Sequence, residues 1–317
     1  MARPFLLLLD KYKRMFYNGS KSSGGNIMHY IEAKGILNSR NGMNLYRGCQ
    51  HGCIYCDARS KCYQIDHIFE DIAVKGNALE LLEQVLKSKR RPCMIGTGSM
   101  SDPYMPLEAQ LEMTRRVLLL IARYGFGATV LTKSDLVVRD LDVLEQIHRR
   151  AKAVVQMSLT CFDEELSRFL EPNVVNTQAR VEALEKIQKA GVPSVVWLCP
   201  ILPFLTDTEE NIRSIVEACA ATGVRGIIQF GAGLTLREGN REYFYAKLDS
   251  RFPGLKERYI RTYGNAYELL SPEHPRLMAL FHELCDRYGI WHDNDRVFSY
   301  ISTFEEAQPT CQLSLFD

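Results

Sequence analysis

Three cysteines close together in the sequence have the residue type and spacing of metal ligands. Cys49, Cys53 and Cys56 form a C-x3-C-x2-C pattern. A cluster of four irons and four sulfides takes one protein ligand for each iron. Three cysteines would leave one iron open to a small molecule, as catalytic zinc sites leave one position open. Ferredoxins use other gaps and a proline after the last cysteine. Asp57 stands there in this chain, which disfavours a simple electron carrier.

A structural zinc site is the alternative for these cysteines, with Cys62 or His51 as the fourth ligand. Zinc sites usually combine one close pair of ligands with a second, distant pair. No second pair follows this motif in the sequence. The pattern therefore favours an iron–sulfur cluster over a zinc-stabilised binding module.

Short apolar strands alternate with amphipathic helices around and after this motif. We expect strands at 43–47, 92–96, 128–132, 153–159, 195–199 and 225–230, and helices at 77–86, 108–124, 141–150, 177–190 and 208–222. Apolar strands that alternate with helices indicate a parallel sheet buried on both faces, with right-handed crossovers. Six units are too few for a closed eight-stranded barrel. We predict an α/β fold: a partial (β/α)6 TIM-type barrel of parallel strands with a C-terminal helical and irregular extension.

Polar residues follow the predicted strands at their carboxyl ends, where parallel α/β folds place their chemistry. Lys133 could pair with a ligand carboxylate, and Asp102 or a hydroxyl could bind an ammonium group or a ribose hydroxyl. Helix capping is the alternative for the hydroxyls, and Asp102-Pro103 is also a common turn opener. The candidates are Thr97, Ser99, Ser101, Asp102, Lys133, Ser134, Ser158, Thr160 and Gln229.

The cysteine motif resembles the signature of the radical S-adenosylmethionine (radical SAM) superfamily, C-x3-C-x-(aromatic)-C, with Tyr55 in the aromatic position. The resemblance implies that Cys49, Cys53 and Cys56 hold a [4Fe-4S] cluster whose open iron binds SAM. In that family the reduced cluster cleaves SAM, and the 5′-deoxyadenosyl radical takes a hydrogen atom from substrate. The resemblance also implies a partial (β/α)6 barrel, and we expect a flavodoxin- or ferredoxin-type electron donor.

Within the superfamily, residues 41–235 look most like the spore-photoproduct-lyase-like branch, whose members resemble DNA repair photolyases. The matching stretches are 101–102, 132–134, 157–159, 168–172 and 200–203. The resemblance implies that Ser101, Lys133 and Ser158 contact the methionine part of SAM. It implies a further contact from Asp102, and we expect Tyr55 to pack near the adenine.

The chain departs from this branch at the position of the hydrogen donor. The lyase has a donor cysteine two positions before the serine matched by Ser101, and this chain has Ser99 there. A serine O–H is a far poorer hydrogen-atom donor than a thiol. Cys62 and Cys199 are candidate donors, and a buried, inert thiol is the alternative for both. The resemblance therefore predicts the branch and leaves the lyase reaction open.

Length and composition are those of a globular protein. The chain has 317 residues, of which 46% are hydrophobic and 24% are charged, enough for a large core. A net charge of +1 gives no overall attraction to nucleic acid, so a nucleic-acid surface would have to be local. Ten cysteines at this length fit a reducing compartment better than a disulfide scaffold. No stretch approaches the length of a membrane span, so we expect a cytoplasmic protein without a membrane partner.

We divide the chain into four segments. Residues 1–27, basic and then rich in glycine and serine, are expected to be a mobile N-terminal extension, with Met28 as an alternative start. Residues 28–235 form the barrel, 236–304 form an extension that packs on it, and 305–317 form a tail. Gln312 to Phe316 in the tail resembles the motif by which bacterial repair and replication proteins bind the sliding clamp. A tail folded onto its own domain is the alternative.

Basic and aromatic residues interleave between Tyr243 and Tyr267. Basic side chains could neutralise phosphates there while tyrosines stack on unpaired bases. The alternative is a solvated helix whose core face carries Leu255, Tyr259 and Tyr263, at i, i+4 and i+8.

Together these features predict a radical SAM enzyme that acts on nucleic acid, with a damaged DNA base as the expected substrate. One alternative is a radical SAM enzyme that acts on a protein, a peptide or a small molecule. The other is a zinc- or cluster-stabilised binding module without catalysis.

Overall fold

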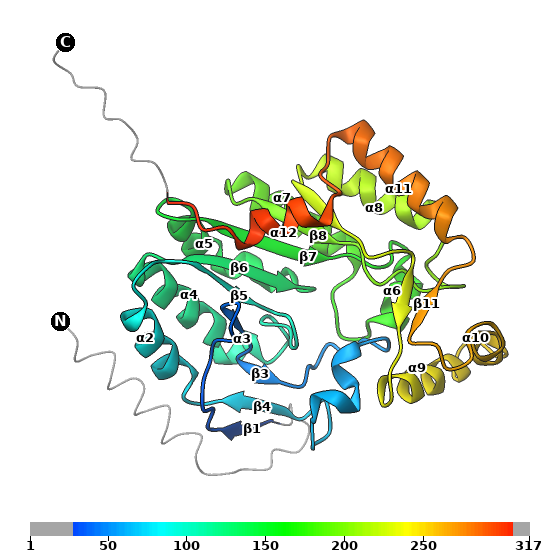
Figure 1. Ribbon diagram of the computed structural model, residues 1–317, viewed down its shortest axis with the longest axis horizontal. Coiled ribbons are helices and arrows are strands. Elements are labelled where there is room, and N and C mark those ends of the chain that lie inside the picture. Colours follow the sequence, from blue (N-terminus) through cyan, green and yellow to red (C-terminus); the bar gives the residue numbers. More distant parts are fainter. Residues whose placement is uncertain (1–27, 307–317) are drawn as a thin grey trace.

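The computed structural model describes residues 28–306, and a six-stranded parallel sheet lies at the centre of it (Figure 1). The strand order is β2-β5-β6-β7-β8-β9, and each neighbouring pair is parallel. The strands are β2 (Gly42–Met43), β5 (Met94–Thr97), β6 (Gly127–Thr132), β7 (Ala153–Ser158), β8 (Ser194–Trp197) and β9 (Gly226–Ile228). The predicted α/β fold with a partial barrel of six parallel strands is confirmed.

Helices cover the outer face of this sheet, as the apolar periodicity indicates. They are α2 (Ala78–Ser88), α4 (Met113–Tyr124), α5 (Leu141–His148), α7 (Thr177–Lys189) and α8 (Glu209–Ala221). Their starts follow the usual capping chemistry. The side chains of Asn176 and Thr208 accept hydrogen bonds from the first turns of α7 and α8. Strand β7 is buried along its whole length, which explains why four of its six residues are apolar.

Two expected elements are divided in the structure. The predicted strand at 43–47 splits into β2 and β3 (Tyr46–Arg47), and β3 joins a second sheet with β4 (Ile72–Lys75) and β1 (Met28–Ile31). The predicted helix at 108–124 breaks at Glu112, which has a φ of 50° between α3 (Glu108–Leu111) and α4. The buried carboxylate of Glu108 stabilises this break, because it accepts a hydrogen bond from Thr114 N at 2.9 Å.

The C-terminal residues pack on the barrel and on the cysteine loop (Figure 1). They form β10 (Gly233–Thr235), α9 (Asn240–Asp249), α10 (Leu255–Tyr263), β11 (Glu268–Leu270), α11 (His274–Tyr288) and α12 (Asn294–Ser302). Helix α11 packs against α8, and α12 packs against β9. Helix α9 contacts the 3-10 turn η1 (Asp57–Arg59), which directly follows the cysteine motif.

The tyrosines of α10 belong to the core. Tyr259 is fully buried, and its hydroxyl donates to the Pro203 carbonyl. The Tyr263 hydroxyl donates to the Leu270 carbonyl at 2.7 Å. The base-stacking interpretation is therefore wrong for Tyr259, and the helical core-face alternative describes Leu255, Tyr259 and Tyr263.

Two predictions fall on residues that the structure does not describe. The N-terminal extension, 1–27, and the clamp-like motif, Gln312 to Phe316, both lie outside residues 28–306. Among the described residues, no helix is long and apolar enough to cross a membrane.

Candidate active site

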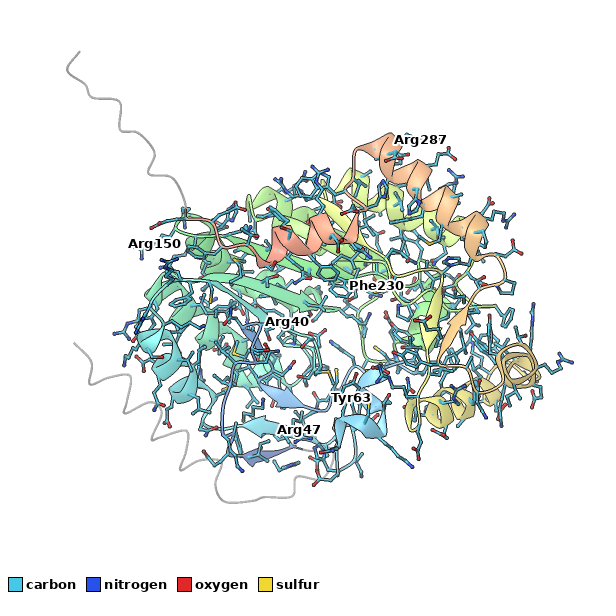
Figure 2. The ribbon with its side chains drawn as sticks, viewed as in Figure 1. Arg40, Arg47, Tyr63, Arg150, Phe230 and Arg287 are labelled. Carbon is cyan, nitrogen blue, oxygen red and sulfur yellow. The ribbon has the colours of Figure 1, made fainter. Side chains whose placement is uncertain are left out.

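A cavity of about 550 Å³ lies at the carboxyl ends of the barrel strands. Enzymes with parallel α/β folds hold their ligands at this edge of the sheet. Tyr63 and Phe230, both labelled in Figure 2, line it from the cysteine-loop side and from the sheet side. The predicted residues that line this one cavity are Cys49, Cys53, Tyr55, Cys56, Ser99, Ser101, Asp102, Lys133, Ser158 and Cys199.

Backbone contacts fix the cysteine loop in the wall of this cavity. Gly48 has a φ of 85°, and a side chain there would collide with the Phe69 carbonyl. That carbonyl accepts a hydrogen bond from Cys49 N at 3.1 Å. Farther along the loop, Ile54 N donates to Leu170 O at 2.9 Å. The three thiols are therefore held on a loop of fixed backbone geometry.

A thiolate at any of the three cysteines would need a positive charge beside it. Burial raises the pKa of the Cys49 thiol to about 12, with the charges of Asp102 and Cys56 acting in the same direction. Burial also raises the pKa of Cys53 and Cys56. Ligand cysteines bind as thiolates. A metal cluster would supply the positive charge that stabilises thiolates in this wall.

The zinc alternative needs the three cysteines and Cys62 or His51 to meet around one metal ion, and they do not. Among residues 28–306, no three His, Cys, Asp or Glu side chains gather closely enough to hold one metal ion. Cys62 is exposed beside Arg237, and His51 Nε2 lies 3.1 Å from Asp102 Oδ2. A cubane presents a separate iron to each cysteine, so its ligands need not meet at one point.

Behind the cysteine loop, a buried ionic network surrounds Glu171. The Tyr55 hydroxyl donates to Glu171 Oε1, and Lys133 Nζ lies 3.1 Å from the same oxygen. Arg180 Nη2 donates to Glu171 Oε2 at 2.7 Å. Burial opposes the charge of Glu171, but Arg180 and Lys133 outweigh it and hold the pKa of this carboxyl at about 2. Burial likewise opposes the charge of Lys133, yet Glu171 raises the pKa of its ammonium group. Lys133 is therefore a fixed cation at the cavity wall.

The same network extends to the end of β7. Arg180 is fully buried on α7, and its Nη1 donates to the Ser158 carbonyl at 2.8 Å. Sequence reasoning missed Arg180, although one signal was available. It shares the apolar face of α7 with Val181, Leu184 and Ile187, where a lone arginine needs a buried partner.

Asp102 joins three segments of the site. Its Oδ1 accepts hydrogen bonds from Tyr104 N at 2.8 Å and from Thr132 Oγ1 at 2.7 Å. Its Oδ2 accepts from Lys133 N at 2.7 Å and faces His51. Burial opposes ionisation, but His51 and these hydrogen bonds hold the pKa of Asp102 below its usual value. Most of its hydrogen-bonding capacity is thus used inside the protein. Ser101 Oγ likewise donates to the Tyr46 carbonyl at 3.1 Å.

The two candidate hydrogen donors have different environments. Cys199 follows β8 and lines the cavity, and burial raises the pKa of its thiol to about 11. Cys62 is exposed and is absent from the cavity lining. Sequence reasoning also missed Trp197 and Phe230, because it searched the strand ends for polar residues only. Both aromatic residues line the cavity.

The model of one protein family, the radical SAM superfamily, matches residues 43–215, which contain the cysteine loop and most of the barrel. The chain belongs to the radical SAM superfamily. An uncharacterised protein of Mycobacterium tuberculosis is 31% identical over 255 residues, which cover 75% of this chain and 74% of that protein. An uncharacterised protein of Methanocaldococcus jannaschii is 32% identical over 169 residues, which cover 53% of this chain and 62% of that protein.

Solved structures of spore photoproduct lyase have the same fold. One mutant has a TM-score of 0.63 and 13% identity, covering 91% of this chain and 94% of that chain. The lyase complexed with dinucleoside spore photoproduct has a TM-score of 0.62 and 12% identity, covering 90% and 93%. The predicted superfamily is confirmed, together with its two cofactors, SAM and a [4Fe-4S] cluster.

As a radical SAM enzyme, the protein needs a reductant. When bound, the two cofactors supply reductive cleavage of SAM and a radical that takes a hydrogen atom from substrate. The chain's own contribution is a cavity lined by the three cysteines of the motif, by Lys133 and by Cys199.

Proposed function

We propose that this radical SAM enzyme acts on nucleic acid, with a damaged DNA base as its substrate. Phe230 carries the proposal, because its ring lines the cavity although 60% of the residue is exposed. Its centroid lies 5.9 Å from Trp197 and 6.0 Å from Phe298, on which it stacks at 28°. An exposed ring supported by two others is a platform for an unpaired base, and such stacking contributes about 1–3 kcal/mol per base.

Two arginines that contact residues of the cavity or of its neighbourhood support this proposal. Arg47 is exposed, and it donates to the carbonyl groups of Tyr63 and Gln64. Arg237 lies over the ring of Tyr267 at 4.8 Å, and its Nε lies 3.3 Å from Oδ1 of Asp57, a residue that lines the cavity. Arginines beside an aromatic cavity can neutralise phosphates next to a bound base. The fold shared with a lyase complexed with dinucleoside spore photoproduct makes a DNA lesion the first substrate to test.

We propose the following roles for the cavity residues. Cys49, Cys53 and Cys56 ligate the cluster, and Lys133, kept cationic by Glu171, attracts the carboxylate of SAM. Ser101 and Ser158 are the polar groups that contact its methionine part, and Asp102 fixes the loops around them. The Tyr55 hydroxyl is bound to Glu171, which leaves the ring of Tyr55 for the adenine.

Replacing Phe230 with alanine is expected to weaken binding of damaged nucleic acid. Losing one stacking partner costs about 1–3 kcal/mol, so the Kd should rise roughly tenfold or more. Fluorescence anisotropy with a UV-irradiated thymine oligonucleotide measures this change. Tyr288→Ala is the matched control, because Tyr288 is also an exposed aromatic residue but lies at the end of α11, outside the cavity lining. An unchanged Kd in Phe230→Ala, or no binding by the wild type, would favour a protein, peptide or small-molecule substrate.

We propose Cys199, rather than Cys62, as the hydrogen-atom donor. The raised pKa keeps Cys199 as a thiol at neutral pH, and only the thiol has an S–H bond to give. This bond would break homolytically and pass its hydrogen atom to the substrate radical. An electron and a proton from the reductant would then restore the thiol.

Solvent deuterium tests this assignment, since a thiol exchanges its hydrogen with D2O. Wild-type protein in D2O is expected to place deuterium in the repaired nucleotide, whereas Cys199→Ala should not, although it still forms 5′-deoxyadenosine. Cys62→Ala is the matched control and should behave like the wild type. Equal deuterium contents in wild type and Cys199→Ala, measured by mass spectrometry, would exclude Cys199 as the donor.

A further inference from the structure

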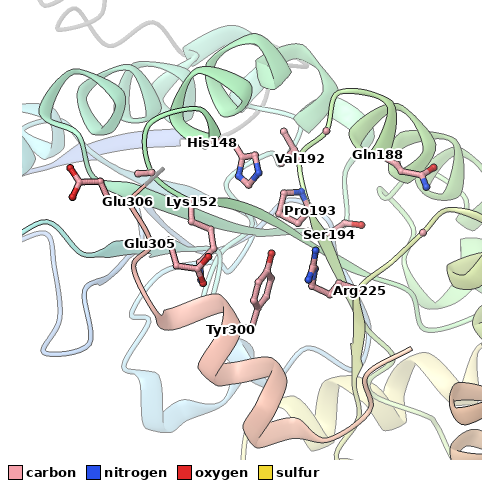
Figure 3. Close-up of a pocket in the computed structure, with 13 residues that line it drawn as sticks. His148, Lys152, Gln188, Val192, Pro193, Ser194, Arg225, Tyr300, Glu305 and Glu306 are labelled. Atoms are coloured by element: carbon pink, nitrogen blue, oxygen red, sulfur yellow. The ribbon is translucent and has the colours of Figure 1, made fainter. Parts of the chain in front are cut away.

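A second cavity, of about 590 Å³, lies at the opposite end of the barrel. Figure 3 shows the residues that line it. It opens at the amino ends of β7, β8 and β9, away from the cysteine loop. Its size is that of a small-molecule site. The polar residues that line it include His148, Lys152, Ser194, Arg225, Tyr300 and Glu305. The proposed function uses none of them.

Lys152 is a buried cation in this cavity whose partner is an exposed carboxylate. Only 2% of its side chain is exposed, and its Nζ lies 2.6 Å from Glu305 Oε1 and 4.5 Å from the centroid of Tyr300. A lysine this buried needs an anion beside it. The Glu305 side chain is 60% exposed and comes from the segment after α12 (Figure 3). The anion that satisfies Lys152 is therefore at the surface, where an external ligand could replace it.

Arg225 supplies a second positive charge. Within the described part of the chain it forms no ion pair, and its guanidinium lies over the rings of Trp291 at 5.3 Å and Tyr300 at 5.0 Å. In Figure 3 the guanidinium and the Tyr300 hydroxyl both face the space between Lys152 and Ser194. Because Glu305 pairs with Lys152, no described carboxylate pairs with Arg225.

The remaining polar groups of the cavity are mostly donors. His148 Nδ1 accepts a hydrogen bond from Ala153 N at 3.2 Å, which leaves Nε2 as the N–H donor of the neutral ring. Ser194 and Tyr300 add hydroxyls. Glu306 also lines the cavity, but its carboxylate points away from the space in Figure 3. Two cations with several donors around them match an anion that has more oxygens than a carboxylate.

We propose that this cavity is a binding site for a phosphate-bearing ligand, whose phosphate group takes the place held by the Glu305 carboxylate. A phosphate has enough oxygens to accept from Lys152 and from the guanidinium of Arg225 together. Glu305 is then a tethered competitor that satisfies Lys152 when no ligand is bound. The cavity is larger than a phosphate ion, so inorganic phosphate and a mononucleotide are both to be tested. This proposal is independent of the nucleic-acid substrate proposed above.

Calorimetric titration of the full-length, cluster-loaded protein under anaerobic conditions tests the site. Inorganic phosphate and adenosine 5′-monophosphate are titrated separately at constant ionic strength. Glu305→Gln removes the competing charge and is expected to bind inorganic phosphate about tenfold more tightly than the wild type. Arg225→Gln removes a charge-assisted hydrogen bond and is expected to bind it about tenfold more weakly. Tighter binding of the mononucleotide than of phosphate would identify a nucleotide as the ligand, and equal affinities would identify phosphate alone.

Matched controls come from an exposed ion pair on α11. Arg287 Nη2 lies 2.7 Å from Glu283 Oε1, and Glu283→Gln and Arg287→Gln should both bind phosphate like the wild type. A rise in Tm with added phosphate is the second expected readout, and at equal phosphate concentration it should be smaller in Arg225→Gln than in the wild type. Two results would overturn the proposal: no phosphate binding by Glu305→Gln at tens of millimolar, or equal affinities in Glu305→Gln, Arg225→Gln and the controls.

Discussion

Replacing Cys53 with alanine is expected to abolish SAM cleavage. Cys53 is the middle cysteine of the motif, and its buried thiol faces the cavity together with Cys49 and Cys56. The superfamily's cluster has one cysteine for each of three irons, so losing one ligand should lose the cluster. Formation of 5′-deoxyadenosine from reconstituted, reduced protein should fall to background, and bound iron and acid-labile sulfide should fall with it.

Cys62→Ala is the control for this variant, because Cys62 lies close to the motif in sequence but is exposed and outside the cavity lining. It should keep both the cluster and SAM cleavage. A full cluster in Cys53→Ala would contradict the ligand assignment. Loss of the cluster in Cys62→Ala would instead place Cys62 among the ligands.

Replacing Arg180 with methionine is expected to destabilise the protein by about 3–5 kcal/mol, because it breaks a buried ion pair and leaves one charge without its main partner. Glu171 would keep only Lys133 and the Tyr55 hydroxyl. Urea unfolding of wild type and variant side by side measures the loss. Arg168→Met removes an exposed i,i+4 pair with Glu164, so it should change stability by no more than about 0.5 kcal/mol.

The pH dependence of stability gives a second test of the same network. The pKa of Glu171 is about 2 in the folded protein, below the ordinary value of 4.5. A carboxyl with a lowered pKa stabilises the fold above its unfolded pKa, and this contribution is lost as the pH falls toward 2. Arg180→Met should raise the folded pKa of Glu171 and so flatten the acid dependence between about pH 4.5 and 2. Equal slopes in wild type and variant over this range would show that Arg180 does not stabilise the charge of Glu171.

The barrel could be predicted because its signal is local. Buried strands such as β7 are mostly apolar, and the helices between them repeat with the period of an amphipathic helix. The polar residues after the strands could then be placed at one edge of the sheet without contact information. Lys133 follows β6, Ser158 ends β7 and Cys199 follows β8, and all three line one cavity for this reason.

What sequence reasoning missed depends on partners that lie outside the element in question. The break at Glu112 reflects the buried carboxylate of Glu108, which also accepts from the Tyr46 hydroxyl on β3. Arg180 pairs with Glu171, nine residues earlier and outside α7, so the apolar face of α7 indicates a buried partner without identifying it. The buried position of Tyr259 likewise depends on Pro203, Phe204 and Phe244, which only the folded chain brings together.

Ser99 stands where we match the donor cysteine of the lyase, so the shared fold does not imply the same reaction. Ser99 is exposed at the cavity, and its hydroxyl accepts from Asn44 at 3.4 Å. A shared fold hosts different reactions when the groups in its cavity differ. A cavity with Cys199 on one wall and Ser99 on another could deliver a hydrogen atom from a different side of the substrate. We therefore propose a nucleic-acid substrate without proposing the reaction of the lyase.

The most direct test of the proposed function is the rate at which the reconstituted, reduced protein forms 5′-deoxyadenosine from SAM, with and without a UV-irradiated oligonucleotide. A bound substrate should complete the cavity and give a hydrogen atom to the 5′-deoxyadenosyl radical. We therefore predict that 5′-deoxyadenosine forms about tenfold faster or more with irradiated DNA. The same sequence without irradiation should give little acceleration. Equal rates with irradiated DNA, untreated DNA and no DNA would contradict the account and move the search to protein, peptide and small-molecule substrates.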